Sequence, residues 1–507
     1  MSKVISSSKA AESIKDGDNI AVGGFAGLSN PEELTSTIEK RFLHTGRPKG
    51  LTIIWSAGQG NGKDKGINHF AHQGLTRRTI GGHYGLCPRM GDLVVDNKIE
   101  AYNFPQGVIS HLYRDIAAKR LGTITHVGLK TYVDPRISGG KINKKATEDL
   151  VEIIELDNKI QLFYKAFPIN IALIRGTSAD KEGNISMEKE AGSIEMLALA
   201  LAAHNSGGKT IVQVERIVES GTLNPWMVKI PSIFVDAIVI SKPDNHWQTF
   251  DEKYNPAFSG EIKIPSDFIP MMPLNERKII CRRALQEIKR GSIINLGIGL
   301  PEGISIVANE ENVTDLMKVT IEAGIIGGIP AGGYSFGASY NPEAIIDQPY
   351  QFDFYDGGGL DIAFLGMAQI DSYGNVNVSK FGGRIIGCGG FINISQNSKK
   401  VVFCGTFTSG GLKIKIKDGK LKIVNEGKHG KFLTNVEHLT FSGEYASECG
   451  QEVLYVTERT VFRLEKGKVT LIEIAPGIDL HGDILARMDF KPLISKNLKN
   501  MDLSIFK

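Results

Sequence analysis

The sequence predicts an α/β protein made of two similar open α/β domains in tandem, with mostly parallel sheets. Three observations support this fold class. Strand patterns alternate with helical patterns, the pattern repeats once along the chain, and a proline-rich segment separates the two copies. Strands that alternate with helices form parallel sheets covered on both faces. At 507 residues the chain is also longer than one hydrophobic core usually supports.

Each half opens with the same series of elements. Residues 14–24 and 288–298 share the order helix end, turn, buried strand and glycine turn. A Pro-Glu step follows at residues 31–32 and at residues 301–302. Proline and acidic residues are typical of the first turn of a helix. In the first half we expect Asn30 to cap that helix.

A second pair of segments matches more strongly. The strand patterns at residues 171–175 and 362–366 are each followed, at the same distance, by an Asp and a Gly-Asn turn. The same offset relates the strand patterns at residues 210–213 and 401–404. The repeat predicts an N-terminal domain at residues 1–240 and a C-terminal domain at residues 276–507, with an insertion in the first half.

Residues 241–275 form the predicted linker. This stretch has no clean period and is rich in prolines and aromatic residues: Pro243, Pro256, Pro265, Pro270 and Pro273, with Trp247, Phe250 and Tyr254. Aromatic side chains need burial, so we expect a linker that packs on the surface rather than a floppy one.

A hairpin is predicted near the C-terminus. Residues 412–417 and 420–424 alternate lysine with apolar residues on either side of an Asp-Gly turn at residues 418–419. Alternation around Asp-Gly is typical of a β-hairpin. The lysines are interpreted as the solvent-exposed face of an edge strand. The alternative is a surface patch that binds an anionic ligand.

Composition excludes several function classes. The net charge of +3 at pH 7 gives no reason to expect nucleic acid or an anionic membrane as a partner. The five cysteines form no CxxC pair, so we expect neither a disulfide framework nor a zinc site, and a reducing compartment fits best. The N-terminus lacks a signal-like apolar region, and the apolar stretch at residues 196–203 is too short to span a bilayer. The cytoplasm is therefore the expected location.

Two motifs point to other chemistry. Residues 297–303 follow a strand with GxGxxxG spacing, which differs from the dinucleotide fingerprint and lacks a well-placed acidic residue for a ribose. Residues 333–337 match GxSxG, the nucleophile elbow of serine hydrolases, with Ser335 as the nucleophile. The elbow needs a strand before it and a helix after it, and neither is predicted.

Glu322 is the most informative residue. It closes a β-branched strand at residues 318–321 and is followed by small residues, although Glu is depleted in strand interiors. A carboxylate placed this way can act as a nucleophile toward a carbonyl. The alternative is an ordinary strand end in water.

Other candidate residues lie in turns. Gln106, in the turn at residues 103–107, can donate to a carbonyl oxygen or can brace the loop. His83 and His111 lie near suggestive loops, but no HExxH-like ligand pair exists, so no metal site is expected. Glycine runs at residues 356–360 and 387–391 suggest a pocket lined by backbone.

Taken together, the motifs resemble class I coenzyme A transferases. Residues 22–27 are similar to the signature of the first half of that family. Residues 320–333 resemble the active-site segment of the single-chain propionate/acetate branch, and residues 340–342, 356–361, 387–391 and 473–479 also look like that branch, as do residues 70–72 and 110–115. The similarity runs through almost the whole chain in order.

The resemblance implies two fused halves with the active site between them, and places the nucleophile at Glu322. Gln106 aligns with a glutamine that helps to orient the thioester carbonyl. The residues expected near the oxyanion and coenzyme A are Gly24, Gly297, Ile298, Gly299, Leu300, Pro301, Gly389 and Gly390. One position departs from the 3-ketoacid branch, which has Asn where this chain has Glu33. The departure favours a simple short carboxylate over a ketoacid as acceptor.

The implied activity is transfer of coenzyme A between a short-chain acyl-CoA and a short-chain carboxylate (the acetate, propionate and butyrate class). Ping-pong kinetics through an acyl-glutamyl anhydride and a glutamyl-CoA thioester are expected. Coenzyme A is a substrate in this scheme, with no permanently bound cofactor and no metal. The branch also suggests a homo-oligomer, a tetramer. Two alternatives stay open: an acyl-CoA hydrolase on the same scaffold and a non-catalytic protein that binds coenzyme A.

Overall fold

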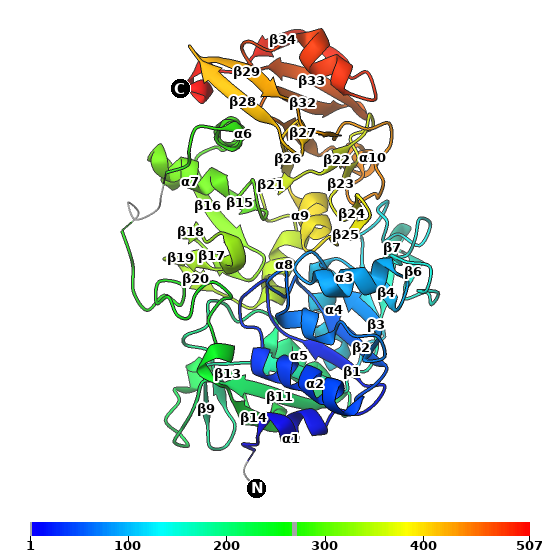
Figure 1. The fold of residues 1–507 in the computed structure, drawn as a ribbon, viewed down its shortest axis with the longest axis vertical. Coiled ribbons are helices and arrows are strands. Elements are labelled where there is room, and N and C mark those ends of the chain that lie inside the picture. The colour runs from blue at the N-terminus through cyan, green and yellow to red at the C-terminus, as the bar shows by residue number, and fades with distance from the viewer. Residues whose placement is uncertain (1–2, 266–270) are drawn as a thin grey trace. The chain divides into compact units, whose positions relative to one another are not determined.

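The structure is a computed structural model that describes residues 3–265 and 271–507, so Pro270 of the predicted linker lies outside the described residues. The chain folds into two compact units that interleave in sequence (Figure 1). Unit 1 comprises Met1–Lys263, Ile321–Asp353 and Gly382–Asn393; unit 2 comprises Ile264–Thr320, Phe354–Phe381 and Ile394–Lys507. Segments from the second half of the sequence therefore belong to unit 1. The domain limits given above stay a prediction.

A seven-stranded parallel sheet forms the centre of unit 1, in the order β14-β11-β8-β1-β2-β3-β4. The strands of the sheet centre consist mainly of buried apolar residues, as expected for a sheet covered on both faces. The strands are β1 (Asn19–Val22), β2 (Leu51–Trp55), β3 (Thr76–Gly81), β4 (Glu100–Asn103), β8 (Ile171–Arg175), β11 (Lys209–Val214) and β14 (Ala237–Ile240).

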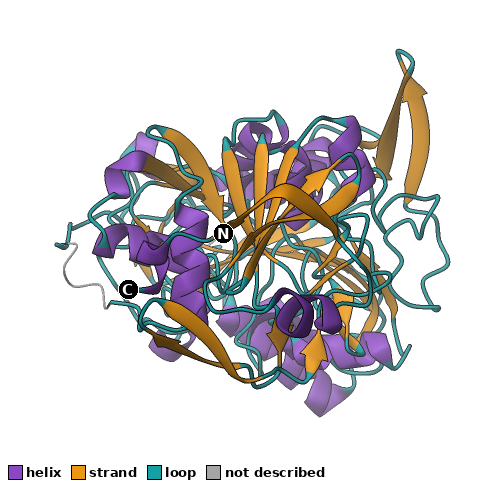
Figure 2. Cartoon of the chain, turned by 90° about the horizontal axis from the view of Figure 1, so that it is seen from above, coloured by secondary structure: helices purple, strands orange, loops and turns teal. Residues whose placement is uncertain are grey.

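Helices lie beside the strands (Figure 2). The Ala- and Leu-rich helix α5 is buried along most of its length and packs on β8, β11 and α4, which accounts for its apolar sequence. The helices of unit 1 are α1 (Ser7–Glu12), α2 (Glu32–Thr45), α3 (Pro88–Val95), α4 (Gln106–Ala117) and α5 (Met196–Asn205); α8 (Gln348–Asp356) begins in unit 1 and ends in unit 2.

Short strands, most of them paired antiparallel, complete unit 1. One sheet contains β5 (Gly122–Thr125), β6 (Val151–Leu156) and β7 (Lys159–Lys165). Another contains β9 (Ser178–Asp180), β10 (Ile185–Ser186), β12 (Arg216–Val218) and β13 (Val228–Ile230). The remaining pairs are β17 (Ile325–Ile326) with β20 (Ala344–Ile345), and β18 (Ile329–Pro330) with β19 (Ser339–Tyr340).

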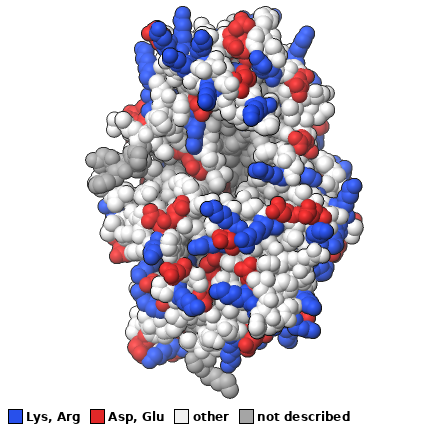
Figure 3. Space-filling model, in the orientation of Figure 1, with Lys and Arg blue, Asp and Glu red and all other residues white. Residues whose placement is uncertain are grey.

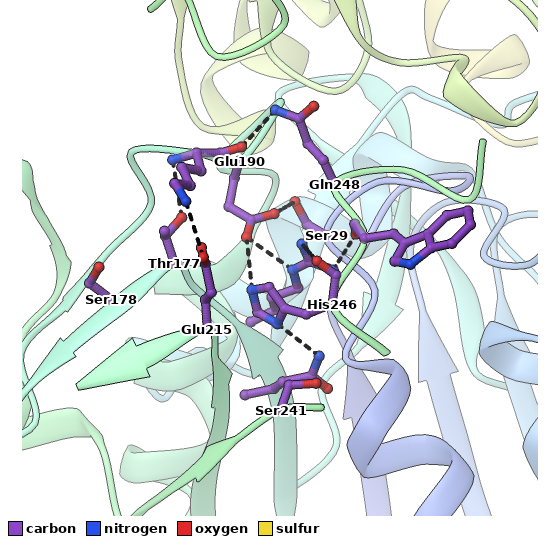
Figure 4. A network of polar contacts seen from close by, with 12 residues as sticks. Ser29, Thr177, Ser178, Glu190, Glu215, Ser241, His246 and Gln248 are labelled. Carbon is purple, nitrogen blue, oxygen red and sulfur yellow. Dashed lines mark hydrogen bonds and ion pairs between the residues drawn. The ribbon is translucent and has the colours of Figure 1, made fainter. Parts of the chain in front are cut away.

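A buried ion pair fastens the start of the predicted linker to unit 1. Arg175 Nε lies 2.9 Å from Glu190 Oε1, and the two side chains are only 3% and 1% exposed. The Arg175 guanidinium also donates to the carbonyl oxygens of His246 and Trp247. Ser29 donates to the other Glu190 oxygen at 3.0 Å, and Figure 4 shows Ser29 and His246 directed toward that carboxylate. The start of the predicted linker, at residues 246–247, therefore packs on unit 1, while the limits of the linker stay a prediction.

His246 is neutral in this cluster. Burial lowers its pKa to about 2, and the positive charges of Arg175 and Lys189 act in the same direction. Its Nε2 lies 3.8 Å from Glu190, but this contact is not an ion pair at neutral pH, because the ring carries no charge there. Glu190 therefore has Arg175 as its charge partner.

The sheet of unit 2 has a parallel part and an antiparallel part. Within the unit the strands run in the order β16-β15-β21-β26-β31-β32-β33-β34. The strands from β16 to β31 are parallel, whereas β31, β32 and β33 pair antiparallel. The bounds are β15 (Ser292–Leu296), β16 (Met317–Ile321), β21 (Ile362–Gly366), β26 (Lys400–Cys404), β31 (Glu452–Val456), β32 (Thr460–Glu465), β33 (Lys468–Ile474) and β34 (Leu493–Asn500).

The helices of unit 2 are α6 (Glu276–Leu285), α7 (Gly303–Glu310) and α10 (Gly443–Glu448), and α9 (Phe391–Asn397) passes from unit 1 into unit 2. The remaining strand pairs are β22 (Gln369–Ile370) with β23 (Val376–Asn377), β27 (Thr408–Ser409) with β30 (His429–Gly430), and β28 (Lys413–Lys417) with β29 (Lys420–Asn425). Strand β24 (Lys380–Phe381) also belongs to unit 2, whereas β25 (Arg384–Ile385) belongs to unit 1.

The two units repeat one topology. The order β14-β11-β8-β1-β2 in unit 1 corresponds to β31-β26-β21-β15-β16 in unit 2. The registers also correspond: Thr210 pairs with Ala172 in unit 1, and Val401 pairs with Ala363 in unit 2, at the offset seen in the sequence. The prediction of two similar α/β domains with mostly parallel sheets is confirmed.

Two local predictions had different outcomes. The β28–β29 hairpin is confirmed, and its lysines are exposed while the isoleucines of β28 are half-buried. On the face shown in Figure 3, acidic and basic side chains are interspersed, in keeping with the small net charge. The predicted cap on α2 is wrong: Pro31 occupies the N-cap, and the Asn30 side-chain oxygen accepts no hydrogen bond from the described residues, while its NH₂ group donates to the Ala26 and Leu28 carbonyls of its own loop.

Candidate functional site

Glu322 follows the last residue of β16 and begins a tight turn. It is 7% exposed, so the alternative of a strand end in water is wrong. Gly324 closes the turn, with its N–H donating to the Ile321 carbonyl at 3.0 Å. Its φ of +99° and a space in which a Cβ would lie 2.0 Å from the Ile346 oxygen both require glycine. The glycine lets a neighbouring chain segment approach the Glu322 turn.

That segment leads to α8 and connects the Glu322 turn to other loops of unit 1. The Ile346 N–H donates to the Gly324 carbonyl at 2.9 Å. Two residues on, the Gln348 N–H donates to the Ile194 carbonyl at 2.7 Å. Between them, the Asp347 carboxylate accepts a hydrogen bond from Ser193 at 2.5 Å. The loop before α5 is therefore held beside the Glu322 turn.

Gln106 opens α4 and lies in the same part of unit 1. Its side chain is buried, and its Nε2 donates to Gln348 Oε1 at 3.0 Å. Its backbone N–H donates to the Gly389 carbonyl at 2.9 Å, so the glycine loop is attached to the first turn of α4. A Cβ on Gly389 would lie 3.7 Å from Gln106 Oε1, so the Gln106 side chain faces this loop.

The loop that contains Gly389 and Gly390 is fixed by backbone bonds. The Gly389 N–H donates to the Gly82 carbonyl at 2.7 Å, and the Cys388 N–H donates to Asn103 Oδ1 at 3.1 Å. Gly389 has a φ of +53°, a conformation that favours glycine. Because its N–H is already engaged, the donor that this loop can offer to a ligand is the N–H of Gly390.

His83 lies against the same loop. A Cβ on Gly58, on Gly85 or on Gly389 would lie 2.7, 2.8 or 3.8 Å from the ring, so small residues surround it. Its Nδ1 is buried and has no hydrogen-bond partner among the residues that the structure describes, and burial lowers the pKa of the imidazole to about 4. His83 is therefore neutral at physiological pH.

Gly24 lies in the loop after β1 and is tied to this region through the following segments. Its φ is +141°, and Gln59 donates to its carbonyl at 3.0 Å. Its neighbour Ala26 pairs with Gly58, the residue that abuts His83, through a short backbone hydrogen bond. Glu33, at the position that departs from the 3-ketoacid pattern, is buried and accepts hydrogen bonds from Ser7 and Asn245.

The other predicted loop belongs to unit 2. Gly297, Ile298, Gly299, Leu300 and Pro301 form the turn between β15 and the start of α7. The Gly299 N–H donates to Glu302 at 2.7 Å, and Gly299 has a φ of +90°. Burial raises the pKa of Glu302 to about 7. Of the two glycine runs in the second half, residues 387–391 lie in unit 1 and residues 356–360 in unit 2.

The serine-hydrolase interpretation does not fit the structure. Residues 333–335 form a single 3₁₀ turn that follows the two-residue strand β18 and leads into β19, not into the helix that the elbow requires. The Ser335 hydroxyl shares a hydrogen bond of 2.8 Å with Thr249. His111 also has a structural environment, because it bridges α4 to the Pro349 carbonyl and to Asp353.

Residues 3–265 and 271–507 contain neither a candidate metal site nor a candidate membrane span. No group of three or more His, Cys, Asp or Glu side chains in this part of the chain could hold a metal ion. No helix in it is both long enough and apolar enough to cross a membrane. All five cysteines are free thiols.

Glu195, Gln348 and Ser56 join the site without any signal in the sequence. Gln348 connects to Gln106, which is 242 residues away, and to Glu195, which is 153 residues away. No local period predicts contacts across such separations. The one hint is Glu195 itself, an acidic residue directly before the apolar helix α5.

Comparisons with known proteins identify relatives of the whole chain. Residues 4–241 match the family model described as coenzyme A transferase. The chain is 48% identical to the caffeate CoA-transferase of Acetobacterium woodii, over 100% of this chain and 98% of that protein. It is 44% identical to the acetate CoA-transferase YdiF of Escherichia coli O157:H7, over 99% of this chain and 95% of that protein.

The fold comparison gives the same result. The crystal structure of the acyl-CoA transferase YdiF in a thioester complex with CoA superposes with a TM-score of 0.95 at 44% identity, covering 100% of this chain and 96% of that chain. These similarities extend over both units, so the chain corresponds to a whole relative and not to one subunit of a divided one. The protein therefore belongs to the coenzyme A transferase family and is an enzyme of its single-chain, fused type.

Proposed function

We propose that this enzyme transfers coenzyme A between a short-chain acyl-CoA and a short-chain carboxylate, with Glu322 as the nucleophile. The observation that carries the proposal is the position of Glu322: a buried carboxylate at the end of β16, in a glycine turn connected through residues 346–348 to Gln106. The relative YdiF is named an acetate CoA-transferase and forms a thioester complex with CoA. Transfer through a thioester between the protein and CoA needs a carboxylate that can become an acyl donor.

In the first half-reaction, a Glu322 oxygen attacks the thioester carbonyl and the CoA thiolate leaves, giving an acyl-glutamyl anhydride. The thiolate then attacks the glutamyl carbonyl, which forms a glutamyl-CoA thioester and releases the donor acid. The acceptor carboxylate attacks this thioester, re-forming an anhydride and the thiolate. Attack of the thiolate on the new acyl carbonyl gives the product acyl-CoA and restores the Glu322 carboxylate.

The surrounding residues would stabilise the oxyanions. Gln106 has a second amide N–H besides the one bonded to Gln348, and Gly390 has a backbone N–H beside it; both are suitable donors to an oxygen that gains negative charge. Burial of Glu322 keeps water from the anhydride and the thioester, which would otherwise hydrolyse. We assign Gly24 and residues 297–301 to binding of coenzyme A, whose binding energy can orient the reacting carbonyl.

This scheme uses coenzyme A as a substrate and draws on no metal or permanently bound cofactor. The expected site of action is the cytoplasm, and the expected assembly is a homo-oligomer, which size-exclusion chromatography with light scattering can measure. The acid partner is the least constrained part, because the relatives are named for acetate and for caffeate. An enzyme discriminates between two acids that differ by one methylene group by only about 1–3 kcal/mol of transition-state binding free energy.

Isotope exchange tests the proposal. Wild-type protein should move labelled acetate into acetyl-CoA without net hydrolysis, and should be assayed against caffeate in parallel. Glu322→Gln should abolish exchange, whereas Glu310→Gln, which removes another buried carboxylate, should retain it. Consumption of acetyl-CoA without an acceptor acid would indicate a hydrolase. Binding of acetyl-CoA with no exchange would indicate a non-catalytic protein.

A further inference from the structure

A chain of buried polar side chains in unit 1 ends on Gln106. The central member is Gln348, whose Oε1 accepts from Gln106 Nε2 at 3.0 Å and whose Nε2 donates to Glu195 Oε2 at 2.7 Å. Glu195 and Gln348 are 1% and 0% exposed. The two residues come from different elements, the loop before α5 and the first turn of α8. Neither belongs to the scheme proposed above.

The hydrogen-bond directions along this chain are determined by the carboxyl group. Ser56 Oγ interacts with Glu195 Oε1 at 2.8 Å, which leaves Oε2 to accept from Gln348. Oε2 remains an acceptor when the carboxyl is ionised and also when a proton resides on Oε1. In both of these states the NH₂ group of Gln348 faces Glu195 and its carbonyl faces Gln106, as in the structure.

The same logic sets the Gln106 amide. An amide can turn by 180° and exchange its oxygen for its NH₂ group, and the two orientations offer opposite hydrogen-bonding groups to a ligand. With the Gln348 oxygen opposite it, only the NH₂ group of Gln106 makes a hydrogen bond there. One N–H is then used, and the second stays on the fixed amide. In a buried network each bond strengthens the next.

Burying the Glu195 carboxyl group at this position costs free energy. The group is buried, and no Lys, Arg or His forms an ion pair with it among residues 3–265 and 271–507. Burial raises its pKa to about 8, and the charge of Asp347 adds to this effect. The preceding residue, Ile194, has a φ of +50°, which is rare and strained for a β-branched side chain. Burying a leucine side chain here would cost less free energy than burying a carboxyl group. Backbone strain of the kind found at Ile194 concentrates at functional sites.

We propose that Glu195 is a positioning residue of the transfer reaction: through Gln348 it holds the Gln106 amide with its NH₂ group presented for the thioester oxygen. The inference rests on the proposed role of Gln106 in oxyanion stabilisation. It concerns the orientation of that amide and not binding of coenzyme A. It therefore predicts an effect on kcat and not on KM.

A double-mutant cycle tests the proposal by steady-state kinetics of acetyl-CoA and propionate. Glu195→Leu should lower kcat by about 10- to 100-fold, the range for losing one strong buried hydrogen bond. The KM for acetyl-CoA should change by less than about threefold. Glu195→Gln should retain most activity, because its amide can accept from Gln348 and donate to Ser56. The double variant Gln106→Ala/Glu195→Leu should be no slower than Gln106→Ala alone, since Glu195 acts only through Gln106.

Each outcome decides one question. If Gln106→Ala lowers kcat and Glu195→Leu lowers it by a further factor in the double variant, Glu195 acts independently of Gln106. The inference is then overturned, while the proposed function stands. If Gln106→Ala leaves kcat unchanged, the proposed role of Gln106 fails, and the inference fails with it. Should Glu195→Leu not fold, Gln348→Met breaks the chain at its centre with a side chain of similar shape. The same cycle with Gln106→Ala then applies.

Discussion

The Arg175–Glu190 pair allows a quantitative prediction about unit 1. Glu190→Ala removes the charge partner that Arg175 has among the described residues, at a contact of 2.9 Å from a guanidinium that is 3% exposed. Breaking a buried pair from one side typically costs about 3–5 kcal/mol, because the remaining charge stays buried. Arg175 keeps carbonyl acceptors at His246 and Trp247. The expected loss of unfolding free energy is therefore near the lower limit, about 3 kcal/mol.

Equilibrium urea unfolding followed by far-UV circular dichroism measures this loss. Glu190→Gln should lose less than Glu190→Ala, because its amide oxygen can still accept from Arg175. Glu219→Ala is the matched control: its pair with Lys181 is exposed on both sides, and such pairs contribute less than about 1 kcal/mol. If Glu190→Ala is no more destabilising than Glu219→Ala, the claim that this pair fastens the linker to unit 1 is wrong.

Two further predictions concern pH and the serine motif. His69 contacts Glu32 and Glu39, and although burial opposes protonation, these carboxylates raise its pKa to about 9. The stability that His69 contributes is then fully present below pH 6.5, the unfolded value, and is lost as pH rises through 9. The difference in unfolding free energy between wild type and His69→Gln should shrink over that window, and a constant difference would contradict the assignment. Ser335→Ala should keep exchange activity within about threefold of wild type, because the Ser335 hydroxyl has a structural role in its hydrogen bond with Thr249. Loss of exchange in this variant would instead support the interpretation of Ser335 as a hydrolase nucleophile.

Local patterns were enough to predict the scaffold. The strand patterns at residues 171–175 and 362–366 became β8 and β21 with the predicted bounds, because a buried parallel strand needs a short run of apolar residues and nothing more. The constant offset between them appeared again as equivalent strand registers. The unusual setting of Glu322, a carboxylate at a strand end before glycines, was visible in the sequence, and the structure shows that this side chain is buried.

The polar surroundings of the site could not be predicted in the same way. The contact between Gln106 and Gln348 depends on how α4 and α8 pack, and no sequence period encodes it. The segment around Glu322 joins unit 1 although it belongs to the second half of the sequence. Asn30 shows the same limit within one loop, because its NH₂ group bonds to the Ala26 and Leu28 carbonyls and holds the side chain in the loop rather than at the start of α2.

The central claim is that Glu322 becomes covalently bonded to coenzyme A during turnover. Incubation with acetyl-CoA, a rapid acid quench and mass-spectrometric peptide mapping test it most directly. The proposed mechanism predicts a coenzyme A adduct on the peptide that contains Glu322, and no adduct in Glu322→Gln. An unmodified Glu322 in protein that still exchanges labelled acetate, or an adduct on a different residue, would contradict it.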